Sequence, residues 1–438
     1  MRTILKRGGL PSKHICIRWL LCLVLMGSQL GHAHSFVIKD TLGLKQYRGK
    51  VLDEKANTVL VSAMLILEGT NISTVTNGQG QFLLKVPARL SERAVRVSHL
   101  GYVSKTIALS EMTKPKTKIR LRPHIERLAE VSVGAIDARL LVRKMLSRKH
   151  LNYPQKSLRM IAFYRETIQK RRDYASLSEA VLDIGKQGYT NRKNDVVKLY
   201  KSRKQTNYKK LDTLAFKLMG GPYNSLSVDL IKYPDFILTE EMLEKYDVSF
   251  TRWTSLNNRS VYVIGFKQKP PFTSPHYYGE LYVDAESFAL VSANYQLNLE
   301  DRKKSRSLFT IRKPRRAVVY PTKASFQVHY RERNGKWFYE YSKIDLKFTV
   351  DWLKKLFNAH YTVSIEMAIT DLKSEAQPEK IKARERLKRS VIISDAVSGF
   401  SDSEFWGEYN IIEPEKSIKN AIKKIRKQLK RKEARSNK

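Results

Sequence analysis

The pattern of apolar and polar positions predicts short strands in the first part of the chain. Between residues 45 and 122, brief apolar runs alternate with turn signals. Asn77-Gly78 is a strong hairpin signal, because a tight primed turn needs positive φ at both central positions. Strands are expected at 47–52, 60–67, 74–75, 82–86, 94–100, 103–109 and 118–121. So many short strands in one small segment predict a β-sandwich.

The pattern then changes to a helical one over residues 135–150. Apolar side chains recur at helical spacing and basic side chains lie mainly on the other side. The expected apolar face consists of Ile136, Leu140, Leu141, Met145 and Leu146. We expect this amphipathic helix to pack on the domain that follows.

From about residue 155 to 370 the dominant period is two, which is typical of strands. Strands are expected at 160–168, 175–184, 260–266, 279–284, 288–297, 318–330, 337–350 and 360–370, with short helices at 211–218 and 225–232. Within 337–350 the apolar set shifts phase from Trp337, Tyr339 and Tyr341 to Ile344 and Leu346. Such a shift predicts a bulge or a change of buried face. The fold class is therefore mainly β: a sandwich, then a large curved antiparallel sheet with a few helices (α+β).

Residues 1–34 are read as a secretory signal peptide. A basic front precedes the short apolar run 19–26, and Gly31-His32-Ala33 forms a small-x-small cleavage site. Cleavage is expected near Ala33 or His34, with lipidation at Cys22 or a buried N-terminal helix as the alternatives. The apolar run is shorter than the ~20 residues that a membrane span needs. We therefore expect an exported protein of the periplasm or outer membrane.

The C-terminal part divides into a mixed-charge connector and a basic helix. The expected segments of the whole chain are 1–34, 45–122, 135–370, 371–403 and 404–438. Glu413-Pro414 favours a helix start, and lysines surround an aliphatic stripe that begins at Ile418. Two interpretations stay open: a helix lying on an anionic membrane, or a helix docked on the sheet with its lysines in water.

Charge and cysteine content narrow the range of partners. The formal net charge is +40, which favours anionic partners, although a diffusely basic surface has the same composition. The export signal argues against nucleic acid, so an envelope protein, a lipid or a glycan is expected. Both cysteines, Cys16 and Cys22, lie in the signal segment. Disulfides, cysteine-ligated metals and a catalytic thiol are therefore excluded from the mature chain.

Several short motifs in the first domain resemble the carboxypeptidase regulatory-like domain, a transthyretin-like sandwich found on exported Bacteroidetes proteins. The motifs are Gly49-Lys50-Val51-Leu52-Asp53, Gly69-Thr70-Asn71, Thr74-Val75-Thr76, Gly80-Gln81-Phe82 and His99-Leu100-Gly101-Tyr102. In metallocarboxypeptidases such a domain sits beside the catalytic one. The resemblance therefore implies an accessory or interaction module.

Further motifs resemble uncharacterised Bacteroidetes proteins that pair this sandwich with a β-rich region. They are Asn152-Tyr153-Pro154, Phe163-Tyr164-Arg165-Glu166, Gly220-Gly221-Pro222-Tyr223 and Phe405-Trp406-Gly407-Glu408-Tyr409-Asn410. That family implies no established activity. The strand 279–284 is also similar to strands of periplasmic lipoprotein-carrier half-barrels, although an ordinary meander has the same pattern.

The sequence offers few candidates for catalysis. It contains no H-E-x-x-H zinc motif, no G-x-S-x-G elbow and no phosphate-binding P-loop, so no metal or cofactor is expected. Arg165 and Glu166 are adjacent in a strand and point to opposite faces, so one of them should be buried as a structural ion pair or a site. Tyr278, Trp337 and Tyr339 are candidates to line a sugar or lipid groove, or else to pack in the core.

Three functions follow as hypotheses. The first is a non-catalytic binding or scaffold protein of the cell envelope that holds an apolar or polymeric ligand or a protein partner. The second is a periplasmic hydrolase of peptide or glycan, which a buried cluster of His and carboxylates in a cleft would favour. The third is a peripheral membrane protein that uses the basic C-terminal helix.

Overall fold

The computed structural model describes residues 43–112, 117–124, 136–171, 173–206, 217–271, 274–309, 311–312, 316–352, 358–373, 380–396, 406–420 and 422. The expected signal peptide, residues 1–34, lies outside these ranges. Residues 43–438 cluster as one compact unit. No helix in the described ranges is long and apolar enough to cross a lipid bilayer.

The first part of this unit is a sandwich of two small sheets, as its alternating pattern predicts. Its strands are β1 (Leu44–Asp53), β2 (Met64–Leu67), β3 (Ser73–Val75), β4 (Gln81–Pro87), β5 (Ala94–Ser98), β6 (Lys105–Ala108) and β7 (Thr117–Leu121). One sheet has the order β4-β1-β7 and the other β3-β2-β5-β6. Val51, Leu65, Phe82 and Val97 are among the buried side chains that fill the space between them.

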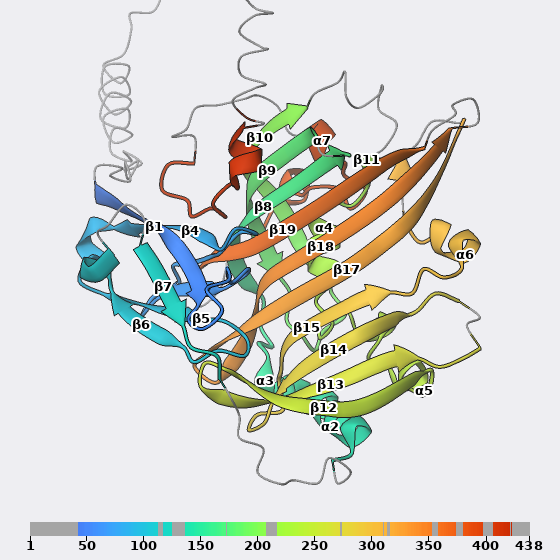
Figure 1. Ribbon diagram of the computed structural model, residues 1–438, viewed down its shortest axis with the longest axis horizontal. Coiled ribbons are helices and arrows are strands. Elements are labelled where there is room, and N and C mark those ends of the chain that lie inside the picture. Colours follow the sequence, from blue (N-terminus) through green and yellow to red (C-terminus); the bar gives the residue numbers. More distant parts are fainter. Residues whose placement is uncertain are drawn as a thin grey trace, which may run out of the picture. The chain divides into compact units, whose positions relative to one another are not determined.

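The rest of the unit is built on a single ten-stranded antiparallel sheet (Figure 1). Its order is β10-β9-β8-β19-β18-β17-β15-β14-β13-β12. The strands are β8 (Leu158–Lys170), β9 (Asp173–Lys186), β10 (Val196–Thr206), β12 (Tyr246–Leu256), β13 (Arg259–Gln268), β14 (Tyr277–Asp284), β15 (Leu290–Leu297), β17 (Ala317–Arg333), β18 (Lys336–Trp352) and β19 (Ala359–Lys373). We call this the large sheet. The predicted mainly β fold is confirmed.

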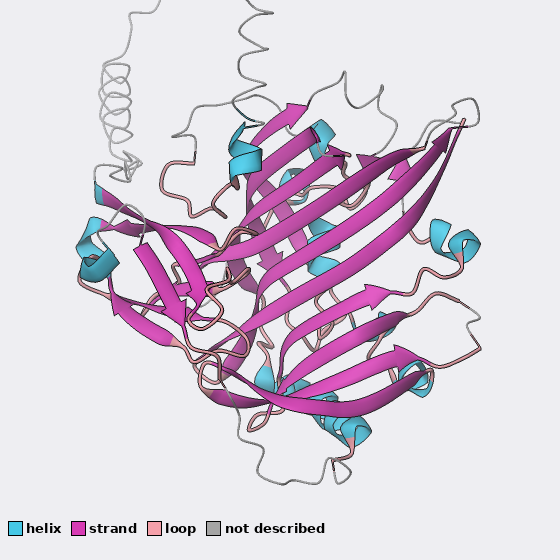
Figure 2. Cartoon of the chain, in the orientation of Figure 1, coloured by secondary structure: helices cyan, strands magenta, loops and turns pink. Residues whose placement is uncertain are grey.

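Short helices complete the fold (Figure 2). They are α2 (Ala138–Ser147), α3 (Lys149–Asn152), α4 (Pro222–Ser227), α5 (Glu240–Glu244), α6 (Arg302–Arg306) and α7 (Ile393–Ala396), with 3-10 turns at Ala88–Leu90, Leu109–Met112, Pro234–Phe236 and Ala383–Glu385. Helix α2 buries Ala138, Val142 and Met145, whereas Leu140 from the expected apolar face is 59% exposed. The helix is thus rotated from the expected orientation, with Val142 in the core.

One face of the large sheet carries the main apolar core. Side chains of α2, α4 and α5 pack there with sheet residues such as Tyr164, Val263 and Phe348. The loop that follows α4 adds Leu230, Ile231 and Ile237 to the same cluster. This face is therefore filled by the protein's own side chains.

On its opposite face, the large sheet is covered by a second apolar cluster at β8, β9, β18 and β19. This cluster joins sandwich residues (Met64, Val75, Leu83), sheet residues (Ile161, Phe163, Val181, Tyr341, Ala368) and residues of the chain's C-terminal part (Trp406, Ile411, Ile412). We call residues 406–420 the C-terminal segment. It shares one small core with both the sandwich and the large sheet.

The C-terminal segment is held by apolar and polar contacts. Trp406 packs edge-on against Phe163, with ring centroids 5.4 Å apart, and the Arg203 guanidinium lies 5.0 Å from its ring. Asn410 accepts from the backbone N–H of Lys85 at 2.7 Å and donates to its carbonyl at 3.1 Å. This amide therefore pairs with β4 much as another strand would. Residues 416–420 are helical.

The predicted phase shift in β18 is a bulge. Tyr330 of β17 faces Tyr339, but the preceding His329 faces Tyr341, so Glu340 is the extra residue. Before the bulge Tyr339 lies in the main core, and after it Tyr341 lies in the smaller one. The bulge therefore places Tyr341 on the same face as Glu340, toward the sandwich, where Glu340 accepts a hydrogen bond from Ser73 at 2.9 Å.

Some elements differ from expectation. Strands β10 and β12 have too many polar and basic residues to stand out as apolar runs, and both form edges of the large sheet. The expected helix 211–218 lies mostly outside the described residues, and its end, Lys217–Leu218, is a short strand (β11) paired with β16 (Ile311–Arg312). Pairing in a ladder here overrides the local apolar spacing.

Candidate functional site

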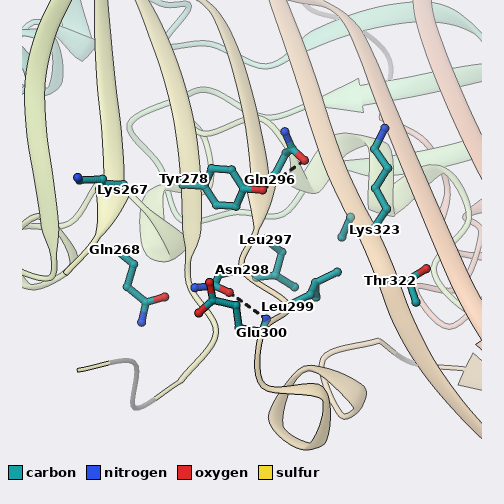
Figure 3. A pocket seen from close by; sticks show the side chains of 11 residues that line it. Lys267, Gln268, Tyr278, Gln296, Leu297, Asn298, Leu299, Glu300, Thr322 and Lys323 are labelled. Atoms are coloured by element: carbon teal, nitrogen blue, oxygen red, sulfur yellow. Dashed lines mark hydrogen bonds between the residues drawn. The ribbon is translucent and has the colours of Figure 1, made fainter. Parts of the chain in front are cut away.

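A surface cavity of about 450 Å³ lies at one end of β13, β14, β15 and β17 (Figure 3). We call it the Tyr278 cavity, after the aromatic side chain at its centre. Its lining residues are Lys267, Gln268, Tyr278, Gln296, Leu297, Asn298, Leu299, Glu300, Thr322, Lys323 and Ala324. Its size suits a small polar molecule or one to two units of a polymer.

Strand register brings the lining residues together. Tyr278 of β14 faces Gln296 of β15, and their neighbours Tyr277 and Tyr295 point into the main core. Alternation along each strand thus places the first two side chains on the outer face. A register shift between Pro321 and Lys323 of β17 gives this edge an extra residue, Thr322. Proline cannot donate to the ladder, which explains a bulge at this point.

The side chains in the cavity are largely available to a ligand. Tyr278 is 42% exposed, and its hydroxyl makes only a long 3.5 Å hydrogen bond to Gln296. Lys267 and Lys323 are exposed and lie on either side of the tyrosine in Figure 3. Gln268 differs, because its amide is used by Ser274 and the His276 backbone. The cavity thus combines an aromatic face, the Gln296 amide, which makes one long hydrogen bond, and two cations.

The other aromatic candidates lie elsewhere. Trp337 and Tyr339 are 2% and 0% exposed and belong to the main core. The Tyr339 hydroxyl donates to the Ser225 carbonyl at 3.0 Å and forms a second hydrogen bond, of 2.6 Å, with the Ser342 hydroxyl, which can donate to it. Their alternation in β18 therefore reflects core packing on the helix-covered face. Of the three aromatic candidates, the structure places Tyr278 alone in the cavity.

Arg165 and Glu166 are both buried, on opposite faces of β8. Arg165 forms an ion pair with Glu179 at 2.6 Å and donates to the Ile412 carbonyl at 2.7 Å, so it ties the C-terminal segment to the sheet. Arg203 binds the other oxygen of Glu179. Glu166 instead accepts a hydrogen bond from Tyr164 at 3.0 Å. Burial raises the pKa of Glu166 to about 7.

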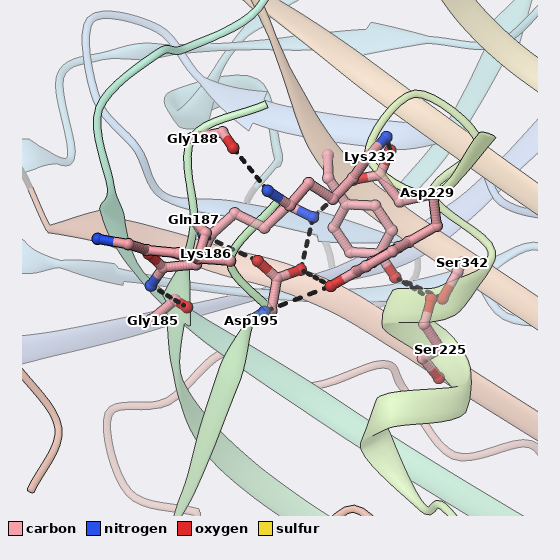
Figure 4. Close-up of polar contacts among 12 residues, drawn as sticks. Gly185, Lys186, Gln187, Gly188, Asp195, Ser225, Asp229, Lys232 and Ser342 are labelled. Carbon is pink, nitrogen blue, oxygen red and sulfur yellow. Dashed lines mark hydrogen bonds and ion pairs between the residues drawn. The ribbon is translucent and has the colours of Figure 1, made fainter. Parts of the chain in front are cut away.

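A buried charged network lies at the end of β9 (Figure 4). Lys186 is fully buried and pairs with Asp195 at 2.8 Å and Asp229 at 2.6 Å. Tyr330 and Tyr233 donate to these two carboxylates at 2.8 and 3.1 Å. Although burial opposes the charge, the carboxylates hold the pKa of Lys186 well above its usual value. Each charge has partners and no solvent access, which indicates a structural role.

A buried serine–histidine pair bears on the hydrolase hypothesis. The Ser292 hydroxyl lies 2.8 Å from Nδ1 of His329, and Ser292 is fully buried. Burial lowers the pKa of His329 to about 3, so its imidazole is a weak base at neutral pH. A general base works best when its pKa is near the working pH. The pair therefore lacks the basicity and access that nucleophilic catalysis needs.

No cluster suited to a metal occurs in the part of the chain that the structure describes, where no three His, Cys, Asp or Glu side chains converge. The Tyr278 cavity contributes one carboxylate, Glu300, beside its two lysines. Its donor set therefore suits hydroxyl, amide and weakly acidic groups better than cations.

Comparison with known proteins identifies the sandwich. Residues 47–133 match the CarboxypepD_reg-like domain family, in agreement with the resemblance of its motifs. A search of curated proteins finds no match. The fold and the cavity thus define a chain in which a regulatory-like sandwich is joined to a large sheet with an open polar pocket.

Three solved structures are similar to more than half of the chain. A Vibrio parahaemolyticus domain described as an outer membrane lipoprotein-sorting protein is 11% identical, with 56% of this chain and 96% of that chain covered and a TM-score of 0.24. A LolA superfamily protein from Nitrosomonas europaea is 12% identical, with 56% of this chain and 96% of that chain covered and a TM-score of 0.22. A DUF1329 family protein from Desulfovibrio piger is 10% identical, with 55% of this chain and 95% of that chain covered and a TM-score of 0.22. Likenesses this weak carry no information about the ligand.

Proposed function

We propose that this chain is an exported, non-catalytic binding protein of the cell envelope that holds a glycan in the Tyr278 cavity. The observation that carries the proposal is an aromatic side chain, 42% exposed, inside a cavity with an amide and two lysines. The ring offers an apolar face to the C–H side of a sugar, and its hydroxyl can donate to or accept from the sugar. Gln296 supplies a donor and an acceptor for sugar hydroxyls.

The charges refine the ligand class. Lys267 and Lys323 face one carboxylate, Glu300, in the lining. A weakly acidic glycan is therefore favoured over a strictly neutral one. An apolar ligand is less suited, because the face of the large sheet that would hold it is filled by the main core.

The proposal is tested with the mature chain, residues 35–438, and two soluble polymers, polygalacturonate and dextran. Calorimetry should show tighter binding of polygalacturonate. Tyr278→Ala should weaken it about tenfold, and Tyr278→Trp should retain it, because the aromatic face is kept. Tyr200→Ala is the matched control, since Tyr200 is 58% exposed on β10 and is not among the cavity's lining residues. Equal affinity of the two alanine variants, or no binding of either polymer, would refute the proposal.

A further inference from the structure

A second cavity, of about 480 Å³, lies where the C-terminal segment meets the outer face of the sheet β4-β1-β7. Its lining residues are Arg48, Gly49, Lys50, Gln81, Phe82, Lys118, Glu413 and Lys419. Four of these side chains are cations and one is a carboxylate. We call it the basic cavity. The Tyr278 cavity has none of these residues, so the two sites are distinct.

Strand geometry forces the cations of the basic cavity together. Arg48 and Lys50 alternate with the buried Tyr47 and Val51 on β1, so both point outward. Lys118 of β7 is the direct register partner of Lys50. Like charges placed opposite each other on neighbouring strands destabilise a sheet. Lys50 and Lys118 thus form a like-charge pair that is unfavourable in the protein without a ligand.

Glu413, the single carboxylate in the lining, neutralises only part of the positive charge of the four cations. Glu413, whose side chain is 6% exposed, accepts hydrogen bonds from Arg48 at 2.9 Å and from Lys419 at 2.5 Å. It fixes these two cations at the cavity wall, where their side chains stay 46% and 44% exposed. Lys50 and Lys118 have no ion-pair or hydrogen-bond partner among the described side chains. Two ammonium groups and the spare N–H groups of Arg48 thus remain for a ligand.

A neighbouring lysine reflects the same crowding of positive charge. Lys85 lies on β4, the strand beside β1, and its ammonium donates to the Gly407 carbonyl at 2.5 Å. Burial, followed by the positive charges of Arg48 and Lys201, lowers the pKa of Lys85 to about 8. An anion bound beside Arg48 would offset this repulsion.

We propose that the basic cavity binds a phosphate group, either free or on a lipid headgroup. A phosphate ester brings up to two negative charges and several acceptor oxygens, which matches two adjacent ammonium groups and a guanidinium. A carboxylate would neutralise only one of the unpaired lysines. The cavity is larger than one phosphate, so it has room for the group to which the phosphate is attached. Because Glu413 and Lys419 belong to the C-terminal segment, the ligand would contact that segment and the sandwich together.

The test uses the mature chain with inorganic pyrophosphate in calorimetry, and with phosphatidylcholine vesicles with or without phosphatidic acid in sedimentation. The double variant Lys50→Gln/Lys118→Gln should bind at least about tenfold more weakly than wild type. The control, Lys105→Gln/Lys347→Gln, removes the same charge at exposed positions outside both cavities and should stay within about twofold. Tyr278→Ala should leave this binding unchanged, which separates the result from the glycan proposal.

The outcomes distinguish a soluble phosphate compound from a lipid headgroup, and some of them would overturn the proposal that the basic cavity binds phosphate. Variant-sensitive binding of pyrophosphate assigns a soluble phosphate compound, and variant-sensitive binding of phosphatidic acid vesicles alone assigns a headgroup. Equal weakening in the two double variants, or no binding of either probe, would overturn the proposal. The Lys50→Gln/Lys118→Gln variant should unfold at the same temperature as wild type or a higher one, since repulsion is removed. A much lower temperature would contradict the argument from like charges.

Discussion

The two halves of the large sheet share one core but differ on their other face. At β8, β9, β18 and β19 that face is covered by the sandwich and the C-terminal segment, and residues 160–168 of β8 are buried without interruption. At β12 to β15 that face is open around Tyr278 and along the middle of β12, where residues 247–254 are half-buried or exposed, although Ser292 of β15 is fully buried. In the covered half, polar side chains form buried pairs with one another, such as Arg165–Glu179, whereas in the open half Tyr278 is exposed to solvent. On the large sheet, the exposed aromatic side chain thus lies where the second layer is missing.

The largest loss of stability is expected when Lys186 is removed from the buried charged network of the covered half. Lys186→Met leaves Asp195 and Asp229 buried without their cation, so the free energy of unfolding should fall by roughly 3–5 kcal/mol. Denaturant titration measures this. Lys198→Met is the control, because its pair with Glu385 is about one-third exposed and should contribute at most about 1 kcal/mol. Similar losses in the two variants would show that burial does not set the strength of these pairs.

The next effect concerns the C-terminal segment. Trp406→Ala removes a ring that is 2% exposed and contacts Phe163 and Arg203, so stability should fall by about 3 kcal/mol or more. Proteolysis should then release the segment before the rest of the protein unfolds, since its small core is broken. Unchanged protease resistance would mean that the polar contacts of Asn410 and Glu413 suffice to hold it.

Carboxylates in the two halves should respond to pH in opposite directions. The pKa of Glu166 is raised to about 7 by burial, so the native state holds a proton longer than the unfolded chain and stability falls as pH rises from about 4.5 to 7. Glu166→Gln should remove this loss and stabilise the protein at pH 8 by roughly 2–3 kcal/mol. Melting temperatures at pH 5 and 8 test it; an equal shift at both values would contradict it.

Glu280 provides the comparison from the open half. Hydrogen bonds from Arg252 hold its pKa below the usual value, so its contribution is present at neutral pH and is lost as pH falls through the acidic range. Glu280→Gln should therefore destabilise the protein at pH 7 and have little effect near pH 3. Both partners are partly exposed, so the shift in melting temperature should be small.

The smallest effect on stability is expected at the Tyr278 cavity. Tyr278→Ala removes an exposed ring that makes one long hydrogen bond, so the free energy of unfolding should change by less than about 1 kcal/mol. Denaturant titration beside Trp406→Ala makes the contrast direct. A loss comparable to that of Trp406→Ala would mean that the open half depends on its surface aromatics for packing.

The sequence predicts what is local. The strands expected at 160–168 and 175–184 and the phase shift in β18 depend on neighbouring residues, and each is present in the structure. The hairpin expected at Asn77-Gly78 was wrong: residues 77–80 form a turn, but its positive φ lies at Gly80, and the flanking strands β3 and β4 belong to different sheets. The cavities are different. Tyr278 is identifiable as an aromatic in a strand, but Gln296 and Lys323 join it through register with β15 and β17, which periodicity does not set. Likewise Lys50 and Lys118 come from separate strands of the sandwich, and Lys419 lies at the far end of the chain.

The contact between Arg165 and the C-terminal segment also joins residues that are distant in the sequence, so periodicity could not predict it. The opposite-face relation of Arg165 to Glu166 follows from strand alternation, but its second partner, the Ile412 carbonyl, is 247 residues away. Trp337 and Tyr339 show the converse: an alternating aromatic pattern describes equally a groove wall and a core, and only the helices packed on that face distinguish them.

The late position of the C-terminal segment has a consequence for how the chain is made and moved. The hydrogen-bond partner of the Lys85 backbone, Asn410, is 325 residues further along the chain, and the ion-pair partner of Arg48, Glu413, is 365 residues further along. Until the C-terminal segment emerges from the ribosome, the small core around Ile161 and Phe163 lacks Trp406, Ile411 and Ile412. Non-local contacts of this kind form slowly. The small core of the nascent chain thus stays incomplete until synthesis is nearly finished, which leaves the chain vulnerable to aggregation if synthesis stops early.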